Sequence, residues 1–166
     1  MKEYQAIAKK TICFELFHGN ESVGRLTSNS WFSFNALIEL ANNSNYQVTP
    51  KGFFGTTIEV KDEYNVLLKF KMNWNGDIVI YTYFENIEKG YILKRRGFLN
   101  ESFLLINQDG LELLALKPNL KWNKMNYEYQ ITTSDQFEGY SYKELLLMTS
   151  VHCANYYMAM MAAVIC

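Results

Sequence analysis

The densest group of residues that could bind a ligand is the basic run Lys94, Arg95 and Arg96. Lys89 lies just before this run, and Lys51 could join it from a related part of the chain described below. Guanidinium and ammonium groups bind phosphate and other anions, so the run is a candidate site for an anion or a lipid head group. The same charges are also typical of a solvated strand face that protects an edge, and both interpretations stay open.

Other residue types that could do chemistry are sparse. The two histidines, His18 and His152, are not at metal-binding spacing, and the nine glycines are too scattered for a phosphate-binding loop. No Gly-x-Ser-x-Gly nucleophile motif occurs. The carboxylates Asp62, Glu63 and Asp109 fall in expected turns, where acidic residues are common for structural reasons. We therefore expect neither catalytic residues nor a cofactor or metal. A small-ligand carrier or enzyme, with His18 or an acidic pair at one end of the fold, is the alternative.

Net charge and cysteine content limit which partners the protein is expected to bind and in which cellular compartment it is expected to occur. The 16 basic and 17 acidic residues give a formal charge of −1, without the basic excess typical of nucleic-acid binding. Cys13, Cys153 and Cys166 are odd in number and widely spaced, which argues against disulfides or a zinc site. The first ten residues contain no apolar run of the kind found in a signal peptide. The sequence therefore predicts a cytoplasmic protein that binds no nucleic acid.

The elements that must position these residues are mostly strands. Aromatic residues make up 16% of the chain and only two prolines occur, a composition that favours β-structure. Alternating apolar residues and turn signals predict strands over residues 12–17, 22–27, 34–40, 46–49, 56–60, 66–72, 78–84, 91–95, 102–106, 111–116 and 126–132. Short strands at this spacing are typical of a sandwich or barrel, and the length of 166 residues suits one domain spanning 1–166.

Part of the β-region resembles another part. Residues 51–75 begin with Lys-Gly-Phe and end near Trp74, and residues 96–123 begin with Arg-Gly-Phe and end near Trp122. The offset drifts from 45 to 48 residues, so small insertions separate the copies. The sequence thus predicts an internal duplication within residues 1–133, although any two hairpins share some of these features. Lys51 and Arg96 occupy related positions in the two copies.

The C-terminal segment predicts a helix over residues 141–166. No charged residue occurs from Leu145 onward, the composition favours helix, and Ser141 with Glu144 has the form of a capping box. A helix that is apolar on every side is either buried in a protein core or embedded in a membrane. Polar residues in mid-segment, including His152 and Asn155, favour the core, with a tail anchor as the alternative.

The polar residues of this helix and the tryptophans have two interpretations each. We expect His152 to be a buried neutral histidine, and Asn155, one turn away, to share its environment, both with partners on the strands. A ligand-binding or catalytic role for His152 is the alternative. Trp31, Trp74 and Trp122 could form a binding surface, but tryptophan in a β-protein is more often part of the core or of a turn.

One hairpin of the sequence carries a resemblance to a known group of proteins. Residues 103–114, followed by Lys117 and then Tyr127-Glu128-Tyr129, combine a strand, an Asp-Gly turn and a returning strand that ends at a basic residue. This pattern resembles the tubby C-terminal-like group, which includes the tubby domain, the phospholipid scramblases and the LURP-one-related proteins. The earlier segment, residues 58–71, matches less well because Asn65 replaces the turn glycine.

The resemblance implies a fold and a class of function. Its fold is a closed antiparallel β-barrel of about twelve strands that encloses a hydrophobic C-terminal α-helix. Tubby domains bind phosphoinositide head groups through a basic pocket, and scramblases are linked to calcium-dependent lipid movement, but this chain has no acidic loop of EF-hand spacing. We therefore expect a non-enzymatic binding or scaffold domain that contacts phospholipid head groups or a protein partner.

Overall fold

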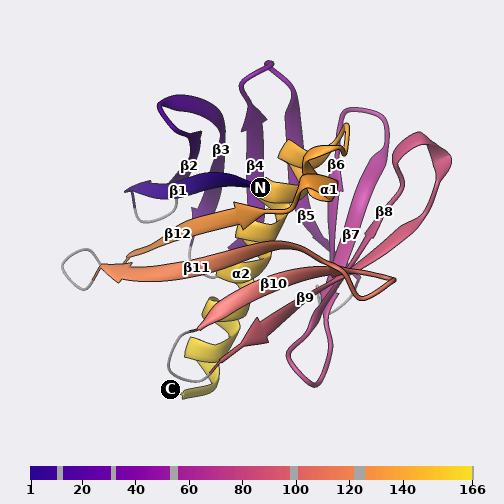
Figure 1. Cartoon of the computed structure of the whole chain (residues 1–166). Helices are drawn as coiled ribbons and strands as arrows, with labels where there is room; N and C mark the ends of the chain where they lie inside the picture. Colours follow the sequence, from indigo (N-terminus) through magenta and orange to yellow (C-terminus); the bar gives the residue numbers. More distant parts are fainter. Residues whose placement is uncertain (11–12, 31–32, 53–55, 98–100, 122–125, 166) are drawn as a thin grey trace.

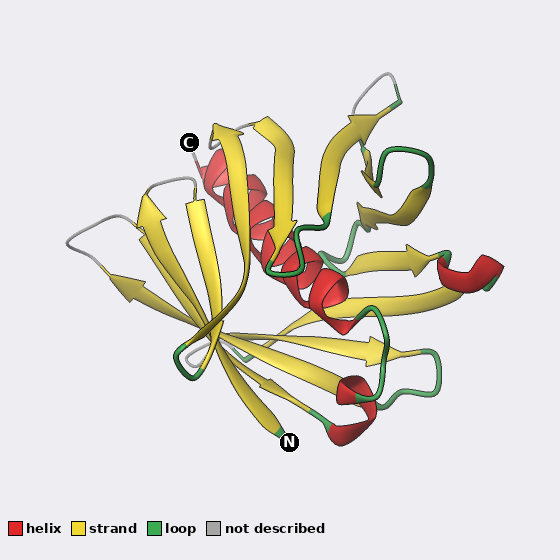
Figure 2. Cartoon of the chain, turned by 90° about the horizontal axis from the view of Figure 1, so that it is seen from above, coloured by secondary structure: helices red, strands yellow, loops and turns green. Residues whose placement is uncertain are grey.

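The chain folds into a closed antiparallel β-barrel of twelve strands with one long helix inside it (Figure 1). The computed structural model describes residues 1–10, 13–30, 33–52, 56–97, 101–121 and 126–165. Seen from above, the strands surround the C-terminal helix (Figure 2). The predicted fold class, a mainly-β barrel enclosing an apolar C-terminal helix, is therefore confirmed.

Strands adjacent in the sequence are also adjacent in the sheet, and β1 pairs with β12 to close it. The strands are β1 (Lys2–Lys10), β2 (Cys13–His18), β3 (Glu21–Ser30), β4 (Ser33–Leu40), β5 (Asn45–Lys51), β6 (Thr57–Lys61), β7 (Val66–Met72), β8 (Ile78–Thr82), β9 (Lys89–Arg96), β10 (Ser102–Asn107), β11 (Glu112–Lys121) and β12 (Asn126–Thr133). A 3₁₀ turn, η1 (Phe84–Asn86), and two helices, α1 (Asp135–Glu138) and α2 (Lys143–Ile165), complete the described elements.

Alternation along each strand separates the core from the outer wall. In β8, Ile78, Ile80 and Thr82 are buried and point inward, whereas Val79 and Tyr81 between them are partly exposed. Because successive side chains of a strand point to opposite faces, the apolar residues predicted from period two become the lining of the barrel.

The sequence prediction missed strand β1, which forms one side of the closing seam. Tyr4, Ala6 and Ala8 point inward and are at most 8% exposed, while Gln5 and Ile7 alternate with them on the outer face. Alanine, lysine and glutamate are depleted in strands, so composition gives little signal. Pairing with β2 and β12 on either side supplies the stabilisation that intrinsic propensity does not.

Strand β11 runs on to Lys121, past Leu116 where the prediction had ended it. Pro118 pairs with Tyr129 of β12, and the described pairing of β11 with β10 stops at Leu116. The missing N–H of the proline therefore falls where the ladder to β10 has ended, a position that tolerates proline.

The two segments of the predicted duplication both contain a hairpin. Hairpins β6–β7 and β10–β11 each have a register shift next to the turn, between Val60 and Lys61 and between Leu105 and Ile106. Residues 53–55, 98–100 and 122–123 of the proposed copies lie outside the described residues. Duplication itself remains a prediction.

Helix α2 fills the barrel. The residues Leu145, Leu146, Leu147, Met148, Val151, Cys153 and Ala154 are at most 2% exposed. They lie on every side of the helix, which is why it has no polar face. Within the described part of the chain, no helix combines the length and the apolar character that a membrane crossing needs.

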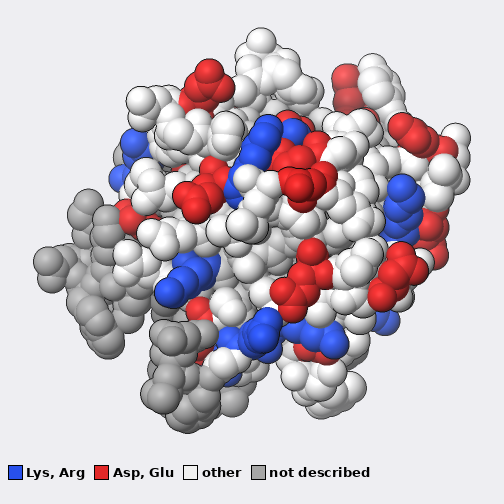
Figure 3. Space-filling view, viewed as in Figure 1, with Lys and Arg blue, Asp and Glu red and all other residues white. Residues whose placement is uncertain are grey.

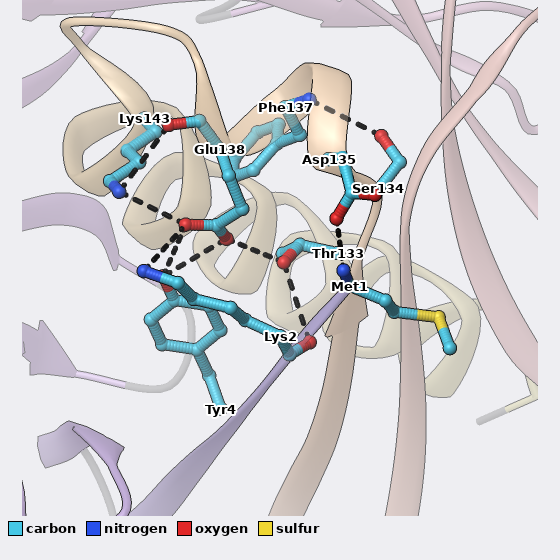
Figure 4. A network of polar contacts seen from close by, with 9 residues as sticks. All are labelled: Met1, Lys2, Tyr4, Thr133, Ser134, Asp135, Phe137, Glu138 and Lys143. Atoms are coloured by element: carbon cyan, nitrogen blue, oxygen red, sulfur yellow. Dashed lines mark hydrogen bonds and ion pairs between the residues drawn. The ribbon is translucent and has the colours of Figure 1, made fainter.

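A carboxylate in α1 ties the start of the helix to the closing seam of the barrel (Figure 4). Glu138 accepts hydrogen bonds from Tyr4 of β1 at 3.0 Å, from Thr133 of β12 and from Lys143 of α2 at 3.0 Å, and Lys2 lies 3.4 Å away. Burial alone would raise the pKa of Glu138, but these hydrogen bonds lower it to about 2. The charged carboxylate thus holds β1, β12 and the two helices together.

The predicted start of the long helix is two residues too early. The Tyr142 carbonyl accepts the bond from the Leu146 N–H that opens the helix, while the Lys143 N–H bonds to Tyr140 in the preceding turn. Ser141 therefore lies in that turn and not at the N-cap. The described serine cap belongs to the short helix α1, where Ser134 Oγ accepts from the Phe137 N–H at 3.2 Å.

The two polar residues predicted in the helix have different environments. Asn155 accepts a hydrogen bond from Tyr129 of β12 at 2.8 Å, as expected. His152 is buried, and among the described residues neither ring nitrogen makes a hydrogen bond of good geometry, although the backbone of Phe34 in β4 interacts with the ring. Its ring lies edge-on to Phe70, 5.9 Å between centroids. Burial lowers the pKa of His152 to about 4, and the backbone of Phe34 offsets this only in part.

We expect a chain that ends at Tyr142, without α2, not to fold. Replacing one buried leucine by alanine lowers the free energy of unfolding by about 2–5 kcal/mol. The loss of three buried leucines of the helix therefore approaches the whole stability of about 5–15 kcal/mol of a typical domain. The measurement is a two-dimensional amide NMR spectrum together with a urea titration. A dispersed spectrum and a cooperative transition in the shortened chain would show that the barrel does not need its helix.

We expect the free energy of unfolding to fall by about 2 kcal/mol between pH 7 and pH 5 because of His152. The folded-state pKa of about 4 lies below the ordinary value of 6.5, so the unfolded chain takes up the proton first and stability decreases as pH falls. Urea titrations of wild type and His152→Leu over this range measure the effect. Glu138 contributes only below its ordinary pKa of 4.5. An equal pH dependence in both proteins would contradict this role of His152.

Candidate functional site

The predicted basic run lies at the end of β9, where the strand separates its three side chains. Tyr91 and Leu93 are buried at the inner face of the barrel. Because side chains alternate, Arg95 continues this inner row, whereas Lys94 and Arg96 point to the outer wall. The structure therefore does not bring the three predicted site residues into one pocket.

Arg95 reaches the C-terminal half of helix α2 and is held there by Tyr157. Its Nη1 donates to the Tyr157 hydroxyl at 3.3 Å, and its Nη2 forms an ion pair with Glu101. The guanidinium carbon also lies 5.9 Å from the centroid of the Tyr157 ring. The hydrogen bond to Tyr157 and the charge of Glu101 raise the pKa of Arg95. About a third of its side chain remains accessible to solvent.

These residues line an open pocket of about 290 Å³, which we call the Arg95 mouth. The lining residues are Asn75, Gly76, Asp77, Arg95, Gly97 and Tyr157. Gly76 has φ of +86°, and a Cβ there would lie 3.3 Å from Cε2 of Tyr157. Glycine thus allows the β7–β8 turn both to adopt this left-handed conformation and to pack against the tyrosine.

Trp74 is fully exposed next to the Arg95 mouth. It lies in the same β7–β8 turn as Asn75 and Gly76, and its relative exposure of 108% means that its ring contacts little of the protein. Sequence analysis favoured a core or turn-packing role for such a residue, and for Trp74 this was wrong. Trp31 and Trp122 lie outside the described residues.

The remaining basic residues of the predicted cluster are dispersed. Arg96 pairs with Glu112 at 3.3 Å on the outer surface, and Lys51 lies 3.9 Å from Glu59. Lys89 is at the opposite end of β9, with its ammonium 5.8 and 5.9 Å from the Tyr140 and Tyr142 ring centroids. On the face shown in Figure 3, basic and acidic side chains are interspersed, without a large patch of one sign.

The residues predicted for an alternative catalytic or carrier site do not converge. The ring of His18, at the end of β2, lies tilted against the ring of Tyr4, with 5.1 Å between ring centroids. Asp62 accepts bonds from the backbone N–H groups of Tyr64 and Asn65, which is the structural role expected of a turn carboxylate. In the described ranges, no group of three or more His, Cys, Asp or Glu side chains could hold a metal ion.

Comparison with models of known protein families, with curated proteins and with solved structures finds no match to this chain. The site must therefore be interpreted from its own geometry. Arg95 offers a partly exposed guanidinium at an open pocket, and Trp74 offers an exposed apolar ring beside it. This pair suits a surface that is anionic and partly apolar.

We expect Gly76→Ala to lower the free energy of unfolding more than Gly110→Ala does. Both glycines have φ above +80°, so both substitutions cost about 1–2 kcal/mol through the backbone. Only at Gly76 does the added Cβ also press on a neighbour, Tyr157, because nothing lies within 4 Å of the corresponding point at Gly110. Urea titrations of the two variants provide the comparison. Equal losses would mean that the turn does not pack on Tyr157.

Proposed function

We propose that this chain is a non-enzymatic binding domain of tubby-like type that contacts anionic phospholipid through the Arg95 mouth. The observation that carries the proposal is a partly exposed arginine beside a fully exposed tryptophan, Trp74, at one end of the barrel. Arginine binds phosphate in a bidentate manner, and tryptophan is favoured at the boundary between lipid and water. The sequence resemblance to the tubby C-terminal-like group supports the same class of ligand.

Binding would exchange one anion for another. Glu101 now pairs with Arg95, and both side chains are about one-third exposed. An ion pair this accessible to water is worth about 0–1 kcal/mol, so a phosphate with several negative charges can replace the carboxylate. Tyr157 would hold the guanidinium in place during the exchange.

Among the described residues, the interior of the barrel offers no comparable site. Helix α2 occupies it, and the inward side chains of the strands pack against the helix. A carrier that encloses its ligand needs an open cavity at this position. An interior site, the carrier alternative raised by the sequence, therefore has less support than a site at the barrel end.

We expect the protein, at low salt, to float with phosphatidylcholine vesicles that contain phosphatidylserine or a phosphoinositide. The Arg95→Gln variant should lose most of this binding. The matched control is Arg96→Gln, which removes the neighbouring charge from the outer wall. Glu101→Gln should strengthen binding by roughly threefold or more, because it removes the competing anion. Trp74→Ala should weaken it.

Two results would contradict the proposal. The first is the absence of flotation at low salt for the wild-type protein. The second is an equal loss for Arg95→Gln and Arg96→Gln, which would indicate attraction by net charge without a defined site. Thermal unfolding of each variant provides the check that the barrel is intact.

A further inference from the structure

A second surface lies on the outer wall of the barrel, along β9. It is a groove of about 320 Å³ whose floor is formed by Gly90 and Ile92. Val79 and Tyr81 of β8 form one wall, since they pair with Ile92 and Gly90 respectively. We call this surface the β9 groove.

The opposite wall and one end of the groove come from β10 and the turn after it. Ile106 of β10 pairs with Ile92, so Val79, Ile92 and Ile106 form an apolar row across three strands. Gln108 lies over Gly90, where a Cβ would approach its Nε2 to 2.9 Å. The glutamine amide thus closes the Gly90 end of the groove.

Lys94 marks the other end of the groove. It lines the pocket and is exposed, and among the described residues it has no ion-pair partner. Its neighbours Arg95 and Arg96 are both paired with carboxylates. Opposite Lys94, Leu104 is 8% exposed, which keeps the base of this end apolar. The groove therefore combines an apolar floor with one unneutralised cation at its end.

We infer that the β9 groove binds a single-chain apolar carboxylate, with the acid group at Lys94 and the hydrocarbon chain along Ile92 toward Gly90. The distance from Lys94 to Gly90 is four residues of strand, roughly 13 Å. A volume of about 320 Å³ is at the lower end of the range for small-ligand sites, so one chain fits better than a two-chain lipid. The unpaired ammonium selects for a negative head group.

A peptide is a less suitable occupant of this groove. Strands β8, β9 and β10 are hydrogen-bonded on both sides within the closed barrel, so they offer no free edge to an extended chain. A peptide lying across the apolar floor would leave backbone N–H and C=O groups without partners on that side. A hydrocarbon chain has no such groups, so apolar contact and one charge are sufficient.

The test uses decanoate, below its micelle concentration, and the full chain labelled with ¹⁵N. We expect shifts of amide signals in β8, β9 and β10, and a dissociation constant that rises about tenfold or more in Lys94→Gln. Decanol, which lacks the charge, should bind the wild type more weakly by a similar factor. Gly90→Val, which fills the floor, should also weaken binding.

The control variant is Lys117→Gln, an exposed lysine on β11 that is separated from β9 by β10. If decanoate leaves the β8–β10 signals unchanged, the inferred site does not exist. Equal effects of Lys94→Gln and Lys117→Gln, or equal binding of decanol and decanoate, would also overturn it. Vesicle flotation of Lys94→Gln should equal that of the wild type, so a failure of either site can be recognised independently of the other.

Discussion

The fold depends on the need to fill a barrel that is too wide for its own side chains. A closed sheet of twelve strands encloses more space than its inward residues can occupy. Helix α2 meets this need, and because strands surround it, every side of the helix must be apolar. The same constraint decides where a ligand could bind. Because the helix occupies the interior, the ends of the barrel and its outer wall are the surfaces left open to a ligand.

Because the helix is fixed at its start, a side chain further along it can help to position the candidate site. Glu138 joins both strands of the closing seam to the beginning of α2, and its low pKa of about 2 keeps it charged at neutral pH. The same helix continues to Tyr157, in its C-terminal half. Tyr157 in turn holds Arg95 by a hydrogen bond at 3.3 Å. The position of the arginine thus depends on residues that are distant in sequence, which explains why no local sequence motif predicts it.

Sequence reasoning found the architecture because the information is local and repeated. Period-two patterns mark most strands, and the uncharged segment after Glu144 marks the helix. It missed β1, where pairing partners outweigh weak propensity. It ended β11 at Leu116, where the ladder to β10 stops, although the pairing with β12 continues to Lys121. Neither error could be seen without the neighbouring strands.

The candidate site was harder to predict, because residues that are neighbours in the sequence were expected to lie together in space. Lys94, Arg95 and Arg96 were grouped by number, yet a strand directs neighbours to opposite faces. The alternation already visible in Tyr91 and Leu93 could have assigned Arg95 to the inner row. The partners Glu101 and Tyr157 could not have been found in this way, because hairpin register and helix placement decide which side chains meet.

Strand β9 contributes side chains to both proposed surfaces, the Arg95 mouth and the β9 groove. The alternation of its side chains keeps the two surfaces separate. Arg95 faces the barrel end and Lys94 faces the outer wall, so no side chain of the strand contributes its charge to both. The counter-charges differ as well, since Glu101 neutralises Arg95 while Lys94 is left unneutralised within the described chain. A ligand at the proposed Arg95 mouth would compete with this carboxylate, which would favour multiply charged groups such as phosphates. A ligand in the proposed β9 groove would find no carboxylate of the described residues paired with Lys94, so one negative charge would be enough. Pairing on both sides of β9 gives the strand little freedom to couple the two surfaces.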